Sequence, residues 1–276
     1  MSKPETETSG SRIDTHAHVF HPGLRVIESR RFTPNYDASL PRYLAELDRN
    51  GVGYGVIVAL SVLGNDNSYM LESLREAAGR LRGVVGIDPA TDLPKFDDFA
   101  AAGVVGVRVN LTGGLPVPRF NEGPWADAVA ECVRRDWHIE INDRCGRLHE
   151  SVEQLLAAGA RVVVDHFGMP DRTLGIADPG FARLLGFASS RRVWVKLSGD
   201  YRFDPSVAVV AASQLLRAYG PDRLLWASDW PFTQHESTES YAAQVGKLDK
   251  WLPDPVARQT VLVDTPSELF KFGAQR

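Results

Sequence analysis

The sequence contains little cysteine and no excess of positive charge. Only two of its 276 residues are cysteines, Cys132 and Cys145. Two thiols are too few for a disulfide framework in a chain of this length, and their spacing matches no common metal motif. The 31 Lys and Arg residues against 35 Asp and Glu residues give a formal net charge of −4. We therefore expect a reducing, cytoplasmic location and no nucleic-acid partner, because nucleic-acid binding needs a basic surface.

Long apolar runs are absent as well. No segment approaches the about 18 consecutive apolar residues that a membrane span requires. The chain starts with the polar sequence MSKPETETSGS, which lacks the apolar region of a signal peptide. We therefore expect a soluble protein with no membrane partner, and the sequence carries no signal for an oligomeric state. Residues 1–11 are predicted to form a flexible N-terminal tail, and residues 12–276 a single domain.

Short runs rich in Val, Ile and Leu recur along the chain, and a segment with helical spacing of apolar residues follows each run. Eight strands are predicted, over Ile13–His18, Tyr54–Leu60, Arg82–Asp88, Val104–Asn110, Trp137–Asn142, Arg161–His166, Val193–Ser198 and Leu224–Asp229. Most of these runs are apolar on both faces, as parallel strands covered by helices must be. The fold class is therefore α/β, and the count of strands predicts a single (β/α)₈ TIM-type barrel. A doubly wound open sheet is the alternative, but no strand-to-helix turn contains a GxGxxG motif.

The intervening segments predict helices. The apolar residues Leu40, Tyr43, Leu44 and Leu47 share one helical face, and Asn50-Gly51 supplies a stop signal. Another apolar stripe precedes Gly220 and consists of Val209, Ala212, Leu215, Leu216 and Tyr219.

Polar residues end three of the predicted strands, at the end of a barrel where active sites lie. The first strand ends in His16-Ala17-His18, and the sixth and eighth end in His166 and Asp229. Side chains two residues apart on a strand share a face, so both imidazoles of the first strand would enter the barrel mouth. Such a set can move protons or bind a metal. We predict that these four residues are catalytic. The alternative is that they are satisfied core histidines and a capping aspartate.

Two arginines also lie at or just beyond the ends of predicted strands. Arg108 and Asn110 share one face near the end of the fourth strand, and Arg202 lies just beyond the seventh. A guanidinium can bind a carboxylate through two hydrogen bonds, so these arginines predict a small anionic organic substrate. The alternative is that each arginine forms an ion pair that braces the barrel, or is a solvated charge. No chemistry is assigned to His138, which begins a strand at the opposite end of the barrel, or to His235.

Six short motifs in order along the chain resemble the amidohydrolase superfamily, in the branch that contains 2-pyrone-4,6-dicarboxylate lactonase and related sugar-lactone hydrolases. The motifs are DTHAH at 14–18, TPNYDA at 33–38, DHFG at 165–168, VKLS at 195–198, SDWP at 228–231 and LVDTP at 262–266. The resemblance implies an amidohydrolase-like barrel over nearly the whole chain, and it implies an active-site set of His16, His18, His166 and Asp229. It further implies substrate-binding roles for Arg108, Arg202, Tyr36, Ser61 and Asn142.

The chain also departs from this branch. The dicarboxylate lactonases carry an arginine where this chain has Met169, and an aromatic residue where it has Asn142. The resemblance therefore implies a substrate that has fewer carboxylates or presents them differently. Larger amidohydrolases have a lysine or histidine metal ligand on the middle strands, where this chain offers Arg108, Asn110 and Asn142. A dinuclear metal centre is not expected.

The leading functional hypothesis is a hydrolase that opens a small carboxylate-bearing lactone, either 2-pyrone-4,6-dicarboxylate-like or a sugar lactone. Asp229 would be the general base on the attacking water, while His166 and the His16/His18 pair polarise the carbonyl. The enzyme would need either no cofactor, as in the resembling lactonases, or one divalent metal, with Zn²⁺ favoured and His16, His18, His166 and Asp229 as its ligands. The alternatives are a metal-dependent non-oxidative decarboxylase of an aromatic or enoic acid, and a non-catalytic ligand-binding barrel.

Overall fold

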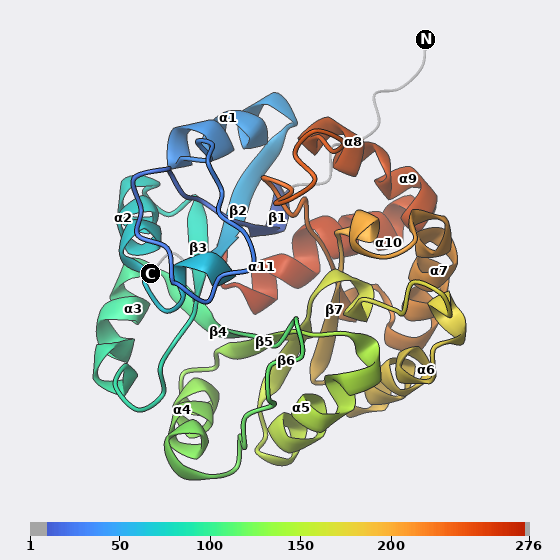
Figure 1. Ribbon diagram of the computed structural model, residues 1–276. Coiled ribbons are helices and arrows are strands. Elements are labelled where there is room, and N and C mark those ends of the chain that lie inside the picture. The colour runs from blue at the N-terminus through green and yellow to red at the C-terminus, as the bar shows by residue number, and fades with distance from the viewer. Residues whose placement is uncertain (1–9, 274–276) are drawn as a thin grey trace.

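Eight parallel strands follow one another in chain order around a barrel in the computed structural model, which describes residues 10–273 (Figure 1). The strands are β1 (Arg12–Ala17), β2 (Val52–Val58), β3 (Leu81–Val85), β4 (Val104–Asn110), β5 (His138–Asn142), β6 (Arg161–Val164), β7 (Val193–Leu197) and β8 (Leu224–Trp226). The predicted (β/α)₈ barrel is confirmed. The predicted sixth and eighth strands are too long, because the backbone turns to positive φ at His166 and Asp229.

The barrel is closed between β1 and the segment that follows β8. The Asp229 backbone N–H donates to the His16 carbonyl oxygen at 2.9 Å, and the His18 N–H donates to the Trp230 oxygen at 2.8 Å. The Thr15 hydroxyl donates to the Trp226 oxygen at 2.8 Å. These bonds hold His16 and Asp229 side by side, although 213 residues separate them in the chain.

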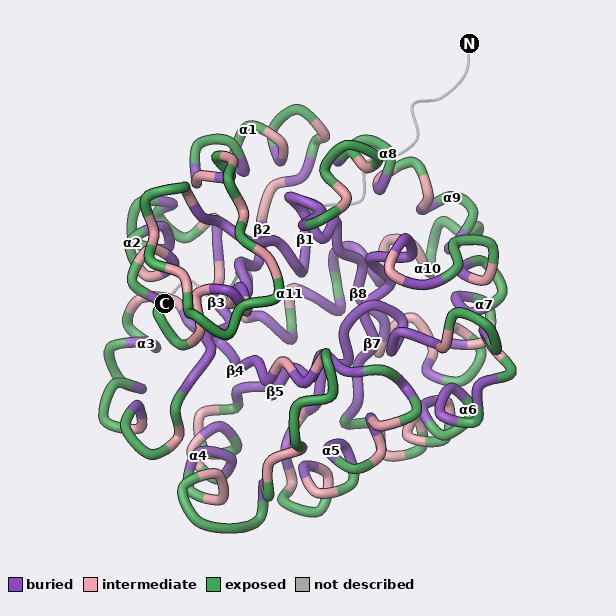
Figure 2. The backbone as a smooth tube through the Cα atoms, viewed as in Figure 1, coloured by how far each residue is buried: buried purple, intermediate pink, exposed green. Residues whose placement is uncertain are grey.

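Helices surround the strands (Figure 1), and the burial pattern in Figure 2 places the buried residues on the strands and on the inward faces of the helices. Their bounds are α1 (Leu40–Arg49), α2 (Ser68–Glu76), α3 (Phe96–Ala102), α4 (Gly123–Arg134), α5 (Cys145–Ala157), α6 (Pro179–Gly186), α7 (Ala208–Tyr219), α8 (Tyr241–Gly246), α9 (Leu248–Trp251), α10 (Pro255–Gln259) and α11 (Thr265–Leu269). Helix α1 buries Leu40, Tyr43 and Leu47 of the predicted face, while Leu44 is only half-buried. Helix α7 instead buries Ala208, Ala211, Ala212, Leu215 and Tyr219, and the prediction of a buried Val209 is wrong, since that residue is 44% exposed. The apolar face is therefore set by alanines that the sequence pattern underweights.

The two ends of the barrel interior differ in polarity. An apolar cluster that includes Val105, Val163 and Leu225 fills part of the interior, together with Phe270 from the end of the chain. The Phe270 ring lies 5.1 Å from the ring of His138, the first residue of β5. This packing closes the amino-terminal end of the strands.

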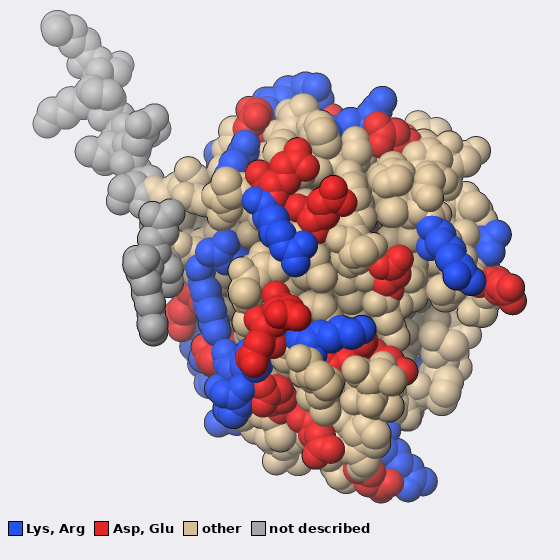
Figure 3. All heavy atoms as spheres, turned by 90° about the vertical axis from the view of Figure 1, so that its left-hand side faces the viewer, with Lys and Arg blue, Asp and Glu red and all other residues tan. Residues whose placement is uncertain are grey.

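The structure also bears on the expectations about cysteines, membrane spans and surface charge. Cys132 and Cys145 are free and buried. Between residues 10 and 273, no helix combines the length and the apolar character that crossing a bilayer requires. The face of the molecule in Figure 3 carries acidic and basic side chains interspersed with one another. Residues 1–9 of the predicted tail, and residues 274–276, lie outside the described residues. The cytoplasmic location and the domain bounds stay predictions.

Candidate active site

The three predicted histidines and the predicted aspartate lie together at the carboxyl end of the strands. The His16 and His18 Nε2 atoms are 3.3 Å apart, and His16 Nε2 is 3.9 Å from Asp229 Oδ1. His166 Nδ1 is 4.0 Å from Asp229 Oδ2. All four side chains are buried. The structure therefore brings together groups from β1 and from the turns after β6 and β8.

Local backbone geometry aims two of these side chains into the site. His166 and Asp229 adopt φ values of 50° and 62°, in the left-handed region that few residues other than glycine visit. Gly199 faces both of them with φ of 60°. A Cβ atom at residue 199 would lie 2.9 Å from His166 Nδ1 and 3.1 Å from Asp229 Oδ2. The site is thus closely packed, and only glycine fits at this position.

The Asp229 carboxylate has one occupied oxygen and one open oxygen. Its Oδ2 accepts hydrogen bonds from the Tyr201 hydroxyl at 2.6 Å and from Arg202 Nε at 2.7 Å. Its Oδ1 is buried and has no hydrogen-bond partner. Burial by itself would raise the pKa of Asp229, but the Arg202 guanidinium, followed by His166 and His16, holds that pKa well below its usual range. The group is therefore an ionised carboxylate whose free oxygen can accept a proton or a ligand.

The imidazoles of His18 and His166 are neutral. Burial lowers the pKa of His166 to about 3 and the pKa of His18 well below its usual value. His18 Nδ1 lies 2.8 Å from the Val58 carbonyl oxygen, which can only accept, so the proton of His18 is on Nδ1 and Nε2 carries a lone pair. His166 Nδ1 lies 2.9 Å from the Ser198 hydroxyl oxygen.

A network of buried charges supports His16 from within the barrel. Lys196 Nζ lies 3.0 Å from His16 Nδ1 and 3.4 Å from Asp165 Oδ1, and it forms an ion pair with Glu140. Arg108 donates to Asp165 Oδ2 from Nε at 3.1 Å and from Nη2 at 2.9 Å. Its Nη1 donates to the Ala59 carbonyl oxygen at 3.0 Å. The guanidinium for which a substrate contact is predicted is thus already bound to a carboxylate.

Positive and negative charges balance in this part of the barrel. Arg108, Lys196 and Arg202 stand against Glu140, Asp165 and Asp229. Sequence reasoning missed Lys196, Glu140 and Asp165. A signal was present, because Glu140 and Lys196 each interrupt an otherwise apolar strand, and a buried charge needs a partner. The sequence could not show that Lys196 pairs with Glu140, since the two residues are 56 positions apart.

The donor atoms fit one divalent cation. His16, His166 and Asp229 offer ligand atoms that all lie within 4.8 Å of one another, and Asp229 Oδ1 has no other partner. His16 can present its Nε2 lone pair if Nδ1–H donates to Asp165 Oδ1, which is 3.2 Å away. If Lys196 donates to Nδ1 instead, Nε2 carries the proton and donates toward His18. His18, the fourth predicted ligand, is not a member of this group of three.

A second group of possible ligands, His16, Glu140 and Asp165, is already neutralised by the chain's own cations. The Lys196 ammonium lies against all three of these residues, and the Arg108 guanidinium lies against both carboxylates. The residues therefore fit one metal ion, and a second ion would have to displace the lysine.

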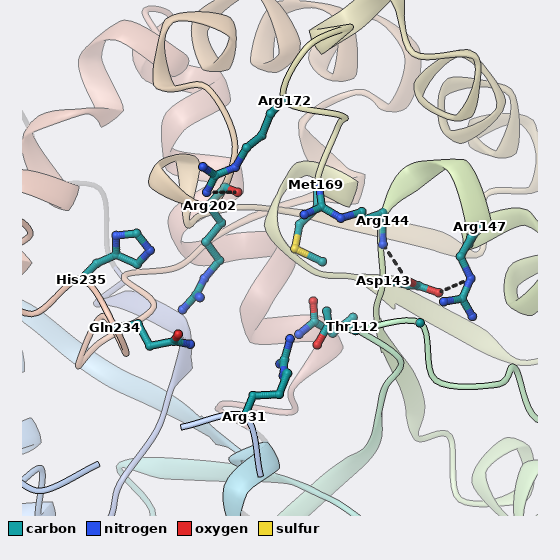
Figure 4. Close-up of a pocket in the computed structure, with 13 residues that line it drawn as sticks. Arg31, Thr112, Asp143, Arg144, Arg147, Met169, Arg172, Arg202, Gln234 and His235 are labelled. Atoms are coloured by element: carbon teal, nitrogen blue, oxygen red, sulfur yellow. Dashed lines mark hydrogen bonds and ion pairs between the residues drawn. The ribbon is translucent and has the colours of Figure 1, made fainter. Parts of the chain in front are cut away.

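Two cavities open beside the site, each of about 480 Å³. Arg202 lines the first cavity (Figure 4). Asn142 lines it as well, while Ser61 and Arg108 line the second. Arg31, Thr112 and Gly113 are common to both.

Two of the residues considered in the sequence lie in unexpected places. Tyr36 borders neither of the two cavities, and its ring packs 5.2 Å from the ring of Phe20. Burial, and next the Glu236 carboxylate, raise the pKa of Tyr36 well above its usual value. His235, to which the sequence assigns no role, lines the first cavity, with its ring 4.7 Å from that of Tyr201.

Comparison with known proteins places this geometry among related chains. The amidohydrolase family profile matches residues 13–272. A 4-sulfomuconolactone hydrolase from Hydrogenophaga intermedia is 30% identical over 267 residues, which are 93% of this chain and 88% of that protein. A 2-pyrone-4,6-dicarboxylate hydrolase from Comamonas testosteroni is 30% identical over 288 residues, which are 98% of this chain and 93% of that protein. A crystal structure from Pseudomonas putida, provisionally named a 2-pyrone-4,6-dicarboxylic acid hydrolase, superposes with a TM-score of 0.89 at 38% identity and covers 96% of this chain and 99% of that one.

Proposed function

The chain belongs to the amidohydrolase family, and on this premise we propose that it is a hydrolase that adds water to a small anionic lactone and opens the ring. The observation that carries the proposal is the buried Asp229 carboxylate, whose Oδ1 has no partner and faces His16. Two relatives at 30% identity over most of the chain are named as hydrolases of anionic lactones.

Asp229 is the proton carrier of this reaction. Its Oδ1 accepts a proton from the water that attacks the lactone carbonyl carbon, and the new carbon–oxygen bond forms as that proton leaves. Arg202 and Tyr201 hold Oδ2, so the carboxylate cannot rotate away from the water. When the ring C–O bond breaks, the same proton passes from Asp229 to the departing ring oxygen, which becomes a hydroxyl. One carboxylate thus serves both halves of the reaction.

The histidines stabilise the negative charge that develops on the carbonyl oxygen. With Lys196 donating to Nδ1, His16 presents an Nε2–H donor in the same space as Asp229 Oδ1. His166 lines this space as a neutral imidazole, whose Nδ1 is held by Ser198. A divalent cation held by His16, His166 and Asp229 would supply Lewis-acid polarisation of the carbonyl group.

Arginines supply the preference for an anionic substrate. Arg202 lines the first cavity while it holds Asp229, so a substrate carboxylate at its exposed edge would lie beside the proton carrier. Arg108 lines the second cavity, where Ser61 accompanies it. We keep Arg108, Arg202, Ser61 and Asn142 as proposed substrate contacts, and Tyr36 as a proposed contact from the adjoining loop.

A panel of lactones with and without carboxylates tests the proposal. Proton release near neutral pH, followed with an indicator dye, is expected for carboxylate-bearing lactones and to be weak for neutral ones. Mass spectrometry is expected to find the ring-opened acid with one water added. Release of carbon dioxide from an aromatic or enoic acid, without lactone opening, would replace this function by decarboxylation. Binding of lactones without any turnover would instead support the alternative of a non-catalytic ligand-binding barrel.

A further inference from the structure

Two residues of the sequence motifs take no part in the proposed reaction, yet they bind each other inside the barrel. Asp14 begins the DTHAH motif on β1, and Ser228 begins the SDWP motif after β8. Asp14 Oδ1 accepts a hydrogen bond from the Ser228 backbone N–H at 2.9 Å, and Oδ2 accepts one from the Ser228 hydroxyl at 2.6 Å. Both residues are fully buried. The pair therefore joins the first strand to the turn after the last, across 214 positions of the chain.

The Asp14 carboxylate is held by neutral donors alone. Oδ1 also accepts from the His16 backbone N–H at 3.3 Å, and Oδ2 accepts from the hydroxyls of Tyr43 at 3.1 Å and Tyr241 at 3.0 Å. Between residues 10 and 273, no lysine, arginine or histidine forms an ion pair with it. Because a buried carboxylate is costly without hydrogen bonds, these donors fix its position in the core.

The Ser228 hydroxyl bridges over the next residue, Asp229. It donates to Asp14 Oδ2 and accepts from the Trp230 backbone N–H at 3.0 Å. The Asp229 backbone N–H itself donates to the His16 carbonyl oxygen at 2.9 Å. The backbone on both sides of Asp229 is thus bound to β1, either directly or through Ser228.

This bridge encloses a backbone conformation that needs support. Asp229 adopts a φ of 62°, and a residue other than glycine stays in this region only where its surroundings hold it there. Arg202 and Tyr201 bind Oδ2 of its side chain, and they do not fix the backbone. If the backbone relaxed, Oδ1 would move from its place 3.9 Å from His16 Nε2.

We propose that Asp14 and Ser228 are positioning residues for the proton carrier. They hold the backbone of Asp229 in its left-handed conformation, so that Oδ1 faces the attacking water. Neither residue lines the two cavities beside the site, so they act through Asp229 and not on the substrate. The inference rests on the proposed function and adds to it the groups that aim its base.

Steady-state kinetics of Asp14→Asn and Ser228→Ala test the inference on a lactone that the wild type hydrolyses. An amide has one acceptor oxygen where the carboxylate has two, and alanine removes the bridging hydroxyl. Each variant is expected to lower kcat by about tenfold to a hundredfold, as a displacement of about 1 Å predicts. KM should stay within about twofold of the wild type, because the cavities are untouched.

Two controls separate positioning from a general loss of structure. Ser151→Ala makes the same substitution at a fully buried serine of α5 whose hydroxyl has no partner in the described chain. Val152→Ala shortens a fully buried side chain of the same helix and lowers the melting temperature without touching the bridge. Both should keep wild-type kcat. If Asp14→Asn does not fold, Ser228→Ala carries the test.

A folded Ser228→Ala variant with wild-type kcat overturns the inference. A loss of kcat as large in Val152→Ala overturns it as well, since that result would show a general effect of lowered stability.

Crystal structures of the wild type and of the two bridge variants separate the inference from the proposed reaction. Relative to the wild type, residue 229 is expected to leave the left-handed region, or its Oδ1 to move by about 1 Å from His16 Nε2. If no lactone is hydrolysed but Asp229 moves in this way, the proposed function fails and the positioning role stands. If lactones are hydrolysed and Asp229 keeps its place in both variants, only the positioning role fails.

Discussion

Replacing Lys196 with methionine probes the buried charges beneath the site. The Lys196 ammonium is fully buried, and it lies against Glu140, against Asp165 Oδ1 at 3.4 Å and against His16 Nδ1 at 3.0 Å. Methionine has a similar length, so the main change is the loss of one positive charge. Three carboxylates then face two cations, and Glu140 loses its ion pair with Lys196 and keeps only the Arg108 guanidinium, whose Nε is 3.4 Å from Glu140 Oε1.

The size of the effect follows from the burial. Leaving one member of a buried ion pair unmatched costs about 3–5 kcal/mol. A protein of this kind has a free energy of unfolding of about 5–15 kcal/mol, so Lys196→Met should remove a large part of it. Adding Glu140→Gln in the same chain removes the unmatched charge as well. The double variant is therefore expected to be more stable than the single one, although each change alone is destabilising.

Urea unfolding with linear extrapolation measures these free energies. Arg49→Met is the control, since Arg49 pairs with Glu46 at 2.6 Å and these two side chains are 66% and 25% exposed, and it should leave stability nearly unchanged. The reasoning is refuted if Lys196→Met unfolds within about 1 kcal/mol of the wild type, which is an ordinary surface effect. A double variant no more stable than Lys196→Met refutes it equally.

Three further predictions follow from other parts of the structure. Gly199→Ala should lower kcat by about tenfold to a hundredfold, because the new Cβ would press on His166 and Asp229. The control is Gly51→Ala, which introduces the same backbone strain at a φ of 65° but has no neighbour within 4 Å, and it should keep wild-type kcat. Burial lowers the pKa of His138 to about 3, so the unfolded chain binds this proton at a higher pH than the folded chain does. The free energy of unfolding should therefore fall as pH drops from about 6.5 toward 3, by about 1.4 kcal/mol per pH unit. In His138→Gln the free energy of unfolding should depend less steeply on pH over that range, and an unchanged slope would contradict the assignment. Elemental analysis should find no more than one divalent ion per chain. Two ions per chain would show that the Lys196 ammonium does not take the place of a cation among His16, Glu140 and Asp165.

The fold could be predicted because most of the strands are short, mainly apolar runs. The fourth strand matches the prediction at both ends, Val104 and Asn110. The sixth and eighth were extended too far, to His166 and Asp229, since the apolar pattern carries no information about the positive φ that these two residues adopt just beyond the strands. That error did not displace the site, because the turn begins at the barrel mouth in either case.

The candidate site was only partly predictable. His16, His18, His166 and Asp229 were found through a general rule about the ends of barrel strands. The pairing of Lys196 with Glu140 was not found, because it depends on which side chains meet across the barrel. Arg31, which lines both cavities, was not predicted, because it lies in a loop between β1 and α1 that has no apolar periodicity.

The measurement that tests the central claim most directly is the turnover of Asp229→Asn on a carboxylate-bearing lactone that the wild type hydrolyses. The amide keeps the shape of the side chain but cannot take a proton from water. The account predicts a folded protein that still binds the lactone, with kcat lower by at least about 10². A folded Asp229→Asn variant that turns over at nearly the wild-type rate would show that another group carries the proton, and would contradict the mechanism proposed for this site.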